Sequence, residues 1–399
     1  MRRRDKKRRG KILLMTALML PALFGLIALA ADVAMLTTAR AQLSTVADAA
    51  ALAGVMQLAD EMRVRGSTNL STEKIAARSR AQSVGQMNKV INTAAIINQN
   101  TTNDPNGDVV IGYVNPATPK AAIQTSSGLE PLFNTVLVRA TRDADHGGPI
   151  PAFFSKIWGN TGTSETVTAE AMAENFPVQG FRPSGSTPAN SPNANLLPIV
   201  LDVTTYNAMM ARTTTDQYSY DSATNTVTSG ADGITESLLY PVASGSPGNW
   251  NTINVGVSSN GTSTLSAQIQ NGISPDEMAT YPNSKIALDY GLNPPSITFS
   301  GNPGISAGLK SALESIIGKP VAIPIYDQSG GNGNNAWYRV IAFQTCRIVS
   351  VNFQGNPKHM IIQPCLLRDS TAIPLTDTTK WPTNWSWQSG GLVRVHLTQ

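Results

Sequence analysis

The hydrophobic and polar positions divide the chain into a basic tip, an apolar run, a helical stretch and a long strand-rich remainder. The apolar run is Ile12–Ala31, twenty residues without a charged side chain. At a helical rise of 1.5 Å per residue it is about 30 Å long, which matches the hydrocarbon core of a bilayer. We therefore predict a transmembrane helix, in which Pro21 is tolerated because neighbouring groups re-satisfy the freed backbone carbonyl.

The residues before the apolar run predict its orientation. Residues 1–11 contain eight Lys or Arg and one acid, Asp5, although the formal net charge of the whole chain is only +4. A basic flank stays in the cytoplasm, so we expect a single-pass inner-membrane protein with a periplasmic or extracellular body. Because the net positive charge is confined to the tip, the composition does not indicate nucleic-acid binding. A secretory signal cleaved after Ala30 is an alternative that would also export the body.

The helical pattern continues beyond the apolar run, over residues 32–64. Apolar side chains such as Leu36, Leu43 and Val46 recur there at steps of three, four and seven residues. One face consists of small residues, which allow helices to approach closely. These residues are Ala47, Ala50, Ala51 and Gly54. We expect this amphipathic, pilin-like helix to pack through its small-residue face against helices of other subunits.

The N-terminal stretch resembles a known family. Its features are the Leu20-Pro21 pair, Asp32 at the outer end of the apolar run, Arg40, and the string Ala-Asp-Ala-Ala-Ala-Leu-Ala-Gly at 47–54. This combination resembles the N-terminal region of TadG-like proteins of the Flp/Tad pilus assembly system. The positions that match the anchor motif are Pro21, Asp32, Arg40, Asp48 and Gly54.

A second stretch resembles the TadE/TadG group in both order and spacing. It contains a strand-like segment at 136–141, a segment at 149–159 that resembles the P-x-x-F-F helix of that group, and a second strand-like segment at 166–171. The resemblance implies a structural or assembly role in a Tad-type pilus, with other Tad pilin-like subunits and assembly components as partners. A surface adhesin or ligand-binding module that uses a pilin-type anchor is the alternative function.

The exported sequence is predicted to form two domains joined by a linker. Residues 65–180 indicate a small α+β domain, because one helical segment is followed by three strand-like segments. These segments are 72–95, 109–114, 133–141 and 166–172. The Pro-, Ser- and Asn-rich segment 181–195 is predicted to be the linker.

The C-terminal half is predicted to be a mainly β domain. Residues 196–399 contain short apolar runs between Gly- and Asn-rich turns, with one helix expected at 305–317. The expected fold is therefore an N-terminal transmembrane α-helix extended by a pilin-like helix, then a small α+β domain and a mainly β C-terminal domain.

The two cysteines fall in one predicted hairpin. If the strands on either side of residues 354–357 pair around a centre between Gly355 and Asn356, Cys346 lies opposite Cys365. Facing Cβ atoms of an antiparallel pair are about 4.5–5.5 Å apart, close to the separation in a disulfide. We therefore expect a Cys346–Cys365 disulfide, with two independent buried thiols as the alternative.

The histidines and the glycine-rich segments of the sequence do not indicate catalysis or cofactor binding. The three histidines, His146, His359 and His396, stand in no H-E-x-x-H motif, and no P-loop sequence occurs. We therefore expect no enzyme activity, no catalytic residue and no cofactor.

Two acidic segments are candidates for metal binding, and both are better explained otherwise. Some TadG-like proteins carry a von Willebrand A module with a D-x-S-x-S motif, but in the string after Asp202 the last hydroxyl position is Tyr206. The second candidate set is Asp216, Asp221, Asn225, Asp232 and Glu236. Their spacing fits no EF-hand loop, so we interpret them as turn residues and expect no metal site.

Overall fold

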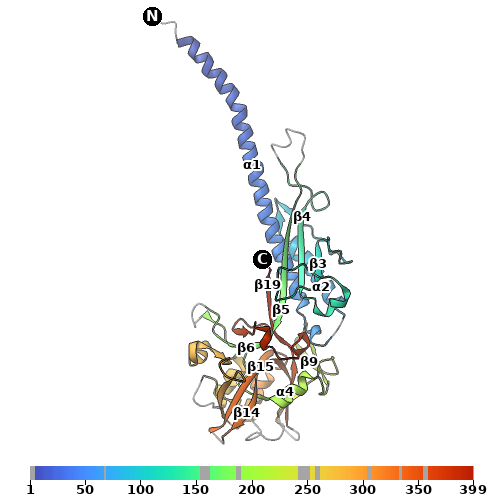
Figure 1. Ribbon diagram of the computed structural model, residues 1–399, viewed down its shortest axis with the longest axis vertical. Coiled ribbons are helices and arrows are strands. Elements are labelled where there is room, and N and C mark those ends of the chain that lie inside the picture. The colour runs from blue at the N-terminus through green and yellow to red at the C-terminus, as the bar shows by residue number, and fades with distance from the viewer. Residues whose placement is uncertain are drawn as a thin grey trace. The chain divides into compact units, whose positions relative to one another are not determined.

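A computed structural model of the chain shows how these segments fold (Figure 1). It describes residues 5–66, 69–152, 162–185, 190–240, 252–256, 261–302, 307–331, 335–353 and 358–398. The chain forms two compact units, each built from separate stretches of sequence. Unit 1 comprises Met1–Ala59, Asn69–Ala173 and Val395–Gln399, and unit 2 comprises Asp60–Thr68 and Glu174–Arg394. The stretches that form each unit are therefore not consecutive in the sequence, whereas we expected consecutive domains.

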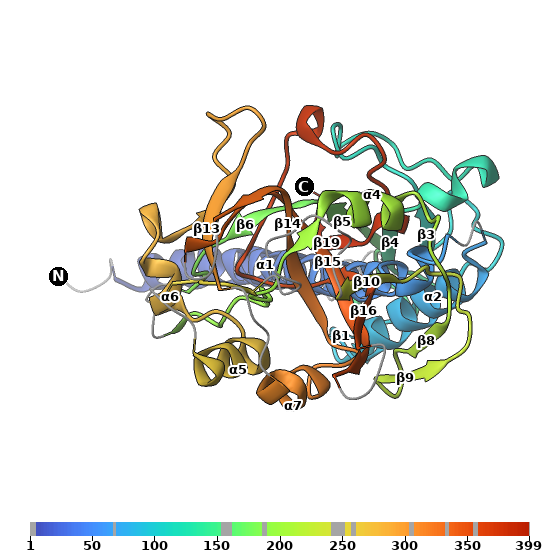
Figure 2. The same cartoon turned by 90° about the horizontal axis from the view of Figure 1, so that it is seen from below.

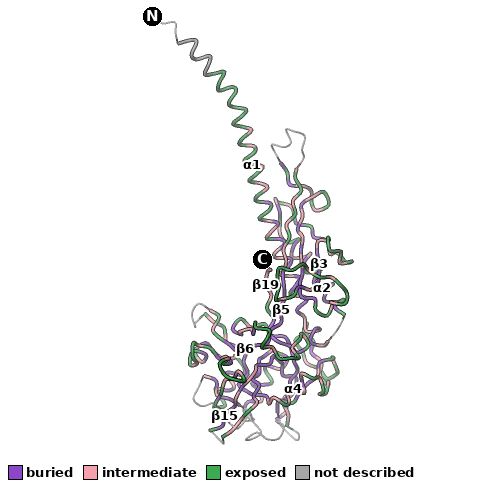
Figure 3. Tube along the Cα trace, in the orientation of Figure 1, coloured by how far each residue is buried: buried purple, intermediate pink, exposed green. Residues whose placement is uncertain are grey.

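One long helix dominates unit 1. Helix α1, Asp5–Leu58, joins the predicted transmembrane and pilin-like helices into one element, with Pro21 inside it. Figure 3 shows that α1 is exposed over its first half and increasingly buried over its second half. In the second half it packs against α2, Ser71–Gln86, and against strand β4, Thr135–Arg142. The first half has no covering within the described part of the chain, which is unusual for an apolar helix in water.

The helix expected at 72–95 is shorter than predicted. It ends at Gln86, and a two-stranded hairpin follows, formed by β1, Lys89–Val90, and β2, Thr93–Ala94. The turn residues Ile91 and Asn92 have φ of 47° and 65°. Two consecutive left-handed residues are the geometry of a tight hairpin turn, and they end the helical pattern.

Three antiparallel strands complete unit 1. They are β3, Val109–Gly112, then β4, and β5, Glu165–Phe176. Val136, Val138 and Ala140 on β4 are buried while the residues between them are partly exposed, as the two-residue period of a strand requires. The three predicted strands are therefore confirmed. The short 3-10 helix η2, Ser127–Leu132, precedes β4. Most of the segment 149–159, which resembles the helix of the TadE/TadG group, lies outside the described residues.

Unit 2 is built around a ten-stranded sheet with the central order β10-β16-β15-β13-β11. Its strands are β6 Val178–Phe181, β7 Leu201–Asp202, β10 Ser237–Tyr240, β11 Thr252–Ile253, β12 Ile286–Ala287, β13 Ile297–Asn302, β14 Pro320–Gly330, β15 Trp337–Asn352, β16 His359–Pro364 and β18 Ala372–Pro374. Long strands β14 and β15 pair along most of their length. The mainly β fold expected for the C-terminal half is confirmed.

The long strand β14 is buried on both faces. Val321, Ile323 and Ile325 belong to one apolar cluster, whereas Ala322 belongs to a second cluster. Successive side chains of a strand point to opposite faces, so the sheet carries a core on each side. This double burial explains why β14 appears in the sequence as a continuous apolar run.

Short elements surround the sheet of unit 2. Two further strand pairs are the antiparallel hairpin β8, Tyr218–Asp221, with β9, Thr226–Ser229, and the parallel pair β17, Leu366–Leu367, with β19, Gly391–Leu397. The helices are α4 Val203–Met210, α5 Thr262–Asn271, α6 Pro275–Ala279 and α7 Lys310–Glu314. The 3-10 helices are η1 Glu61–Arg63, η4 Pro282–Ser284, η5 Ala307–Leu309, η7 Thr378–Lys380 and η8 Trp387–Ser389. Helices α5 and α7 lie side by side (Figure 2).

Two sequence expectations for unit 2 change in detail. The helix expected at 305–317 is represented by η5 and the single-turn α7, while residues 303–306 lie outside the described part. The segment 181–195 is expected to be a linker, but its described ends are integrated into unit 2. Phe181 belongs to β6, Ala194 bridges Ile273, and the Asn195 amide donates to Asp369 at 2.8 Å.

Candidate functional site: the anchor helix and the segment that follows it

The first half of α1 is an exposed apolar surface. Its leucines, isoleucine, methionines and phenylalanine are exposed, with Leu13 at 77% and Leu18 at 71%. By length and composition α1 is able to cross a membrane. An apolar helix that is exposed on all sides is typical of a membrane span, because lipid chains solvate apolar side chains whose contact with water is unfavourable. The helix is therefore compatible with a single-pass anchor.

The small-residue face of α1 is fully buried within unit 1. Ala47, Ala50, Ala51 and Gly54 belong to the second half of α1, and the three alanines are completely buried. A Cβ added to Gly54 would lie 3.2 Å from the Ala77 carbonyl oxygen and 3.3 Å from the Ala81 Cβ. On α2, Ala77, Ala81 and Gly85 recur every four residues, so two small-residue stripes meet and the helices pack closely.

This packing corrects one expectation from the sequence. Small residues do mediate close helix packing, but the partner is α2 of the same chain instead of a helix of another subunit. The reason is that α2 carries the complementary stripe and lies only a short distance further along the chain.

The remaining anchor-motif residues lie along α1. Asp32 and Asp48 are partly buried, and Pro21 lies in the exposed half. Arg40 donates two hydrogen bonds to Glu165 at the start of β5, of 2.8 Å from Nε and 2.9 Å from Nη2. The hydrogen bond and the charge of Glu165 raise the pKa of Arg40. A bidentate pair of this kind fixes orientation as well as distance. No local sequence signal identifies Glu165 as the partner, since it lies 125 positions away.

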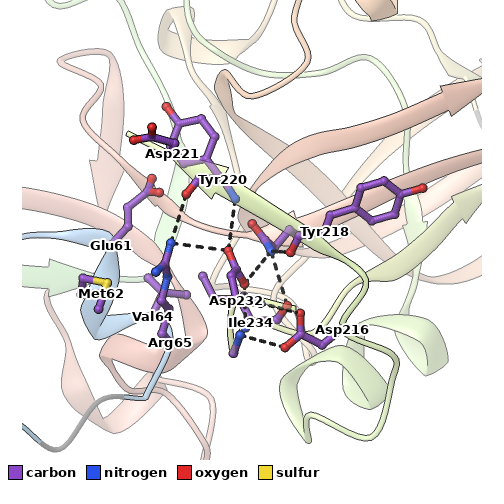
Figure 4. A network of polar contacts seen from close by, with 12 residues as sticks. Glu61, Met62, Val64, Arg65, Asp216, Tyr218, Tyr220, Asp221, Asp232 and Ile234 are labelled. Atoms are coloured by element: carbon purple, nitrogen blue, oxygen red, sulfur yellow. Dashed lines mark hydrogen bonds and ion pairs between the residues drawn. The ribbon is translucent and has the colours of Figure 1, made fainter. Parts of the chain in front are cut away.

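The segment directly after α1 is enclosed in unit 2. Glu61 forms an ion pair with Arg347 on β15, and the guanidinium of Arg63 lies 4.2 Å from the centre of the Trp387 ring. Arg65 donates to the Tyr220 carbonyl at 3.0 Å and lies 3.6 Å from the carboxylate of Asp232 (Figure 4). Three charged side chains within five residues therefore hold this segment in place.

The backbone of the same segment is held by an arginine as well. Arg212 donates to the carbonyl oxygens of Val64 and Arg65. The guanidinium thereby satisfies two carbonyls that the end of η1 leaves without helical partners.

The acidic residues between positions 216 and 236 organise the β8–β9 hairpin. The carboxylate of Asp216 accepts from the amides of Asp232 and Gly233, at 3.0 and 2.8 Å. That of Glu236 accepts from the amides of Gln217 and Tyr218, at 2.7 and 3.2 Å. Burial raises the pKa of Glu236. Figure 4 shows Asp216 and Asp232 directed at backbone groups of the loop.

Other candidates for metal binding also have structural partners. Asp221 accepts from the Ala223 amide, and Asn225 accepts from the Tyr220 hydroxyl at 2.8 Å. Asp202 caps α4 by accepting from the Thr205 amide at 2.8 Å. Within the described ranges, no three His, Cys, Asp or Glu side chains converge on a position that could hold a metal ion.

The two cysteines are free thiols, and the predicted hairpin register holds only near the turn. Asn352 faces His359 as expected, but a β-bulge between Ile348 and Ser350 shifts the pairing by one residue. Cys346 therefore faces Pro364, and the structure has no disulfide between Cys346 and Cys365. A bulge adds one unpaired residue to one strand, which changes the partner of every residue beyond it.

The three histidines occupy separate places. His146 lies between two carboxylates, 2.7 Å from Asp143 and 3.1 Å from Asp108. His359 is hydrogen-bonded to the Ser350 hydroxyl at 2.9 Å, and His396 contacts the carbonyl of the next residue. Each histidine thus has a local structural partner.

Together these features define a class of protein. The chain has an exposed apolar N-terminal helix that continues, without interruption, into a packed helix of a folded unit. The family model described as "Tad: Putative Flp pilus-assembly TadE/G-like" matches residues 10–57, which is nearly the whole of α1. Residues 10–57 are therefore similar to a TadE/G-like Flp pilus-assembly domain, and this similarity supports a pilus-related role. No curated protein and no solved structure matches the chain.

Proposed function

We propose that this protein is a membrane-anchored, minor-pilin-like component of a Tad-type pilus. The observation that carries the proposal is the TadE/G-like match over residues 10–57, together with the exposure of the apolar half of α1. The protein would act by assembly and display, without catalytic turnover. Its partners would be other Tad pilin-like subunits and assembly components.

The proposed topology places the basic tip in the cytoplasm, the apolar run Ile12–Ala31 in the inner membrane and residues 32–399 on the other side. The clustered Lys and Arg residues of positions 1–11 support it, because positive flanks are retained in the cytoplasm. Protease added to spheroplasts should digest the part of the chain that follows the apolar run and leave an N-terminal tag protected. Digestion of the tag in intact spheroplasts would contradict this orientation.

The proposed association face is the exposed side of α1 just beyond the apolar run. Ala34, Thr38, Ala41 and Thr45 recur there at steps of three and four residues and are exposed. The hydroxyls of Thr38 and Thr45 donate to the carbonyls of Ala34 and Ala41, so they need no partner across an interface. The residues of this face are small and regularly spaced, so another helix can approach the face closely, unlike the buried small-residue face.

The test is co-purification of the tagged full-length chain from detergent-solubilised membranes. Wild type should bring down Tad pilin-like and assembly components, and Ala41→Leu should reduce their recovery by enlarging the association face. Ser79→Leu, an exposed position on α2, is the matched control and should leave recovery unchanged. Recovery of the wild-type chain without any pilus component would overturn the proposed function. If Ala41→Leu brought down as much of these components as wild type, only the proposed association face would be overturned.

A further inference from the structure

Unit 2 contains a cavity of about 280 Å³ that none of the pilus-related features uses. Its wall consists mainly of aromatic and proline rings, among them Tyr206, Tyr290, Trp385, Pro294 and Pro295. Ring side chains have few rotatable bonds, so such a wall is largely preformed. Mostly apolar, preformed cavities with few polar groups are the usual form of ligand sites.

The polar groups of the cavity are few and distinct in kind. Lys380 is the charged side chain of the wall, and its ammonium lies 4.6 Å from the centre of the Tyr290 ring. The hydroxyls of Tyr206 and Tyr290 stay neutral donors, because burial raises the pKa of Tyr206 to about 12 and also raises that of Tyr290. The wall thus combines ring side chains, among them two tyrosines, with one cation.

We propose that this cavity binds a proline-rich peptide segment in the polyproline II conformation, with an acidic residue next to the prolines. A polyproline II segment presents pyrrolidine rings that pack on aromatic faces. It makes no internal hydrogen bonds, so its carbonyls are free to accept from the hydroxyls of Tyr206 and Tyr290. It also loses little conformational entropy on binding, which is why aromatic grooves recognise such segments.

The charge of Lys380 favours an acidic residue beside the prolines of the ligand. Its contact with Asp377 is 3.6 Å long, and the two side chains are 46% and 47% exposed. An exposed ion pair of this kind contributes little and exchanges readily with another carboxylate. A ligand carboxylate at the rim would therefore pair with Lys380, whereas a cationic flank would be repelled.

The chemistry of the wall disfavours a carbohydrate. Each sugar hydroxyl that becomes buried needs a hydrogen-bond partner, and leaving it without one costs free energy. A wall made mainly of rings supplies too few partners for a sugar. A proline-rich segment has only carbonyl groups to satisfy, which the two hydroxyls can do.

The experiment is fluorescence anisotropy with the full-length chain in detergent micelles. The probe is a fluorescein-labelled hexaproline peptide that ends in Glu-Glu, compared with the same peptide ending in Lys-Lys. We expect saturable binding that is stronger for the Glu-Glu peptide. Tyr290→Ala should weaken it roughly tenfold, because it removes a central aromatic contact. Tyr290→Phe, which keeps the ring, should retain most of the affinity.

A charge reversal provides the second variant. Lys380→Glu should reverse the preference, so that the Lys-Lys peptide binds better. Lys358→Glu, at an exposed lysine of unit 2 outside the cavity wall, is the control and should behave as wild type. The absence of saturable binding to the Glu-Glu peptide would overturn the proposal. So would binding that survives both Tyr290→Ala and Lys380→Glu unchanged. Neither result would affect the proposed pilus role, which depends on α1.

Discussion

Arg347 on β15 forms an ion pair with Glu61, a residue 286 positions earlier in the chain. The Arg347 side chain is 1% exposed and that of Glu61 is 22% exposed. The guanidinium also lies 3.4 Å from the centre of the Tyr220 ring and donates to the Gly318 carbonyl. A completely buried cation is tolerated only with such partners, because desolvation of an unpaired charge is costly.

The difference in exposure predicts an asymmetry between two substitutions. Glu61→Ala leaves Arg347 buried without its counter-charge and should lower the free energy of unfolding of unit 2 by about 3 kcal/mol. Arg347→Met should cost less, because the partly exposed Glu61 can be solvated. The measurement is urea unfolding of the full-length chain in micelles, followed by tryptophan fluorescence. Equal losses for the two variants would contradict the argument.

The contact between α1 and α2 predicts a cost for enlarging Gly54. A Cβ added to Gly54 would lie 3.1 Å from Val136 Cγ1. Gly54→Leu should therefore over-pack the contact and lower the free energy of unfolding by about 1–3 kcal/mol. Hydrogen exchange of the α2 amides should become faster, since α2 is displaced. Ala41→Leu, on the exposed side of α1, is the control and should leave this exchange unchanged. Unchanged exchange in Gly54→Leu would mean that the helices can separate without penalty.

The burial of the cysteines predicts their reactivity. Both side chains are fully buried, and burial raises the pKa of Cys365 to about 12 and that of Cys346 well above its ordinary value. The thiolate is the reactive form, so the folded protein should react negligibly with a thiol reagent at pH 8. Denaturation without reductant should expose two reactive thiols per chain. If denatured, unreduced protein showed none, the thiols would be joined, contrary to the structure.

The surroundings of His146 predict a pH dependence of unit 1. Burial alone would lower the pKa of His146, but the hydrogen bond to Asp143 and the charges of Asp108 and Asp143 outweigh it and raise the pKa. The folded state therefore binds this proton more tightly than the unfolded state. Its stabilising contribution is complete below the ordinary histidine pKa of about 6.5 and is lost as the pH rises through the raised value.

The variant His146→Gln isolates this contribution. The difference in melting temperature between wild type and variant should be largest near pH 6, where the histidine is charged and the carboxylates are ionised. It should shrink at pH 8.5. A difference that is independent of pH would show that His146 acts through packing alone.

The sequence predicted the span, the small-residue face and the mainly β fold because each is a local pattern. It did not identify the partner of the small-residue face, because a spacing of small residues is the same whether the second helix is in the same chain or another. Nor did it predict the residue that faces Cys346, since no residue near Val349 signals the bulge. Helix α6 was missed although Ser274 and Glu277 form a capping box, a signal that is visible in the sequence.

The position of Asp60–Thr68 in unit 2 has a consequence for how the protein is made. This segment leaves the ribosome directly after the anchor, but its partners Arg347 and Trp387 are synthesised near the end of the chain. Because chains are made from the N-terminus onward, unit 2 must stay incomplete through most of translation. A fragment that begins at residue 196 would lack Glu61 and leave Arg347 without its counter-charge. The C-terminal half therefore depends on Asp60–Thr68 to finish folding, and only a completely synthesised chain can form a finished unit 2.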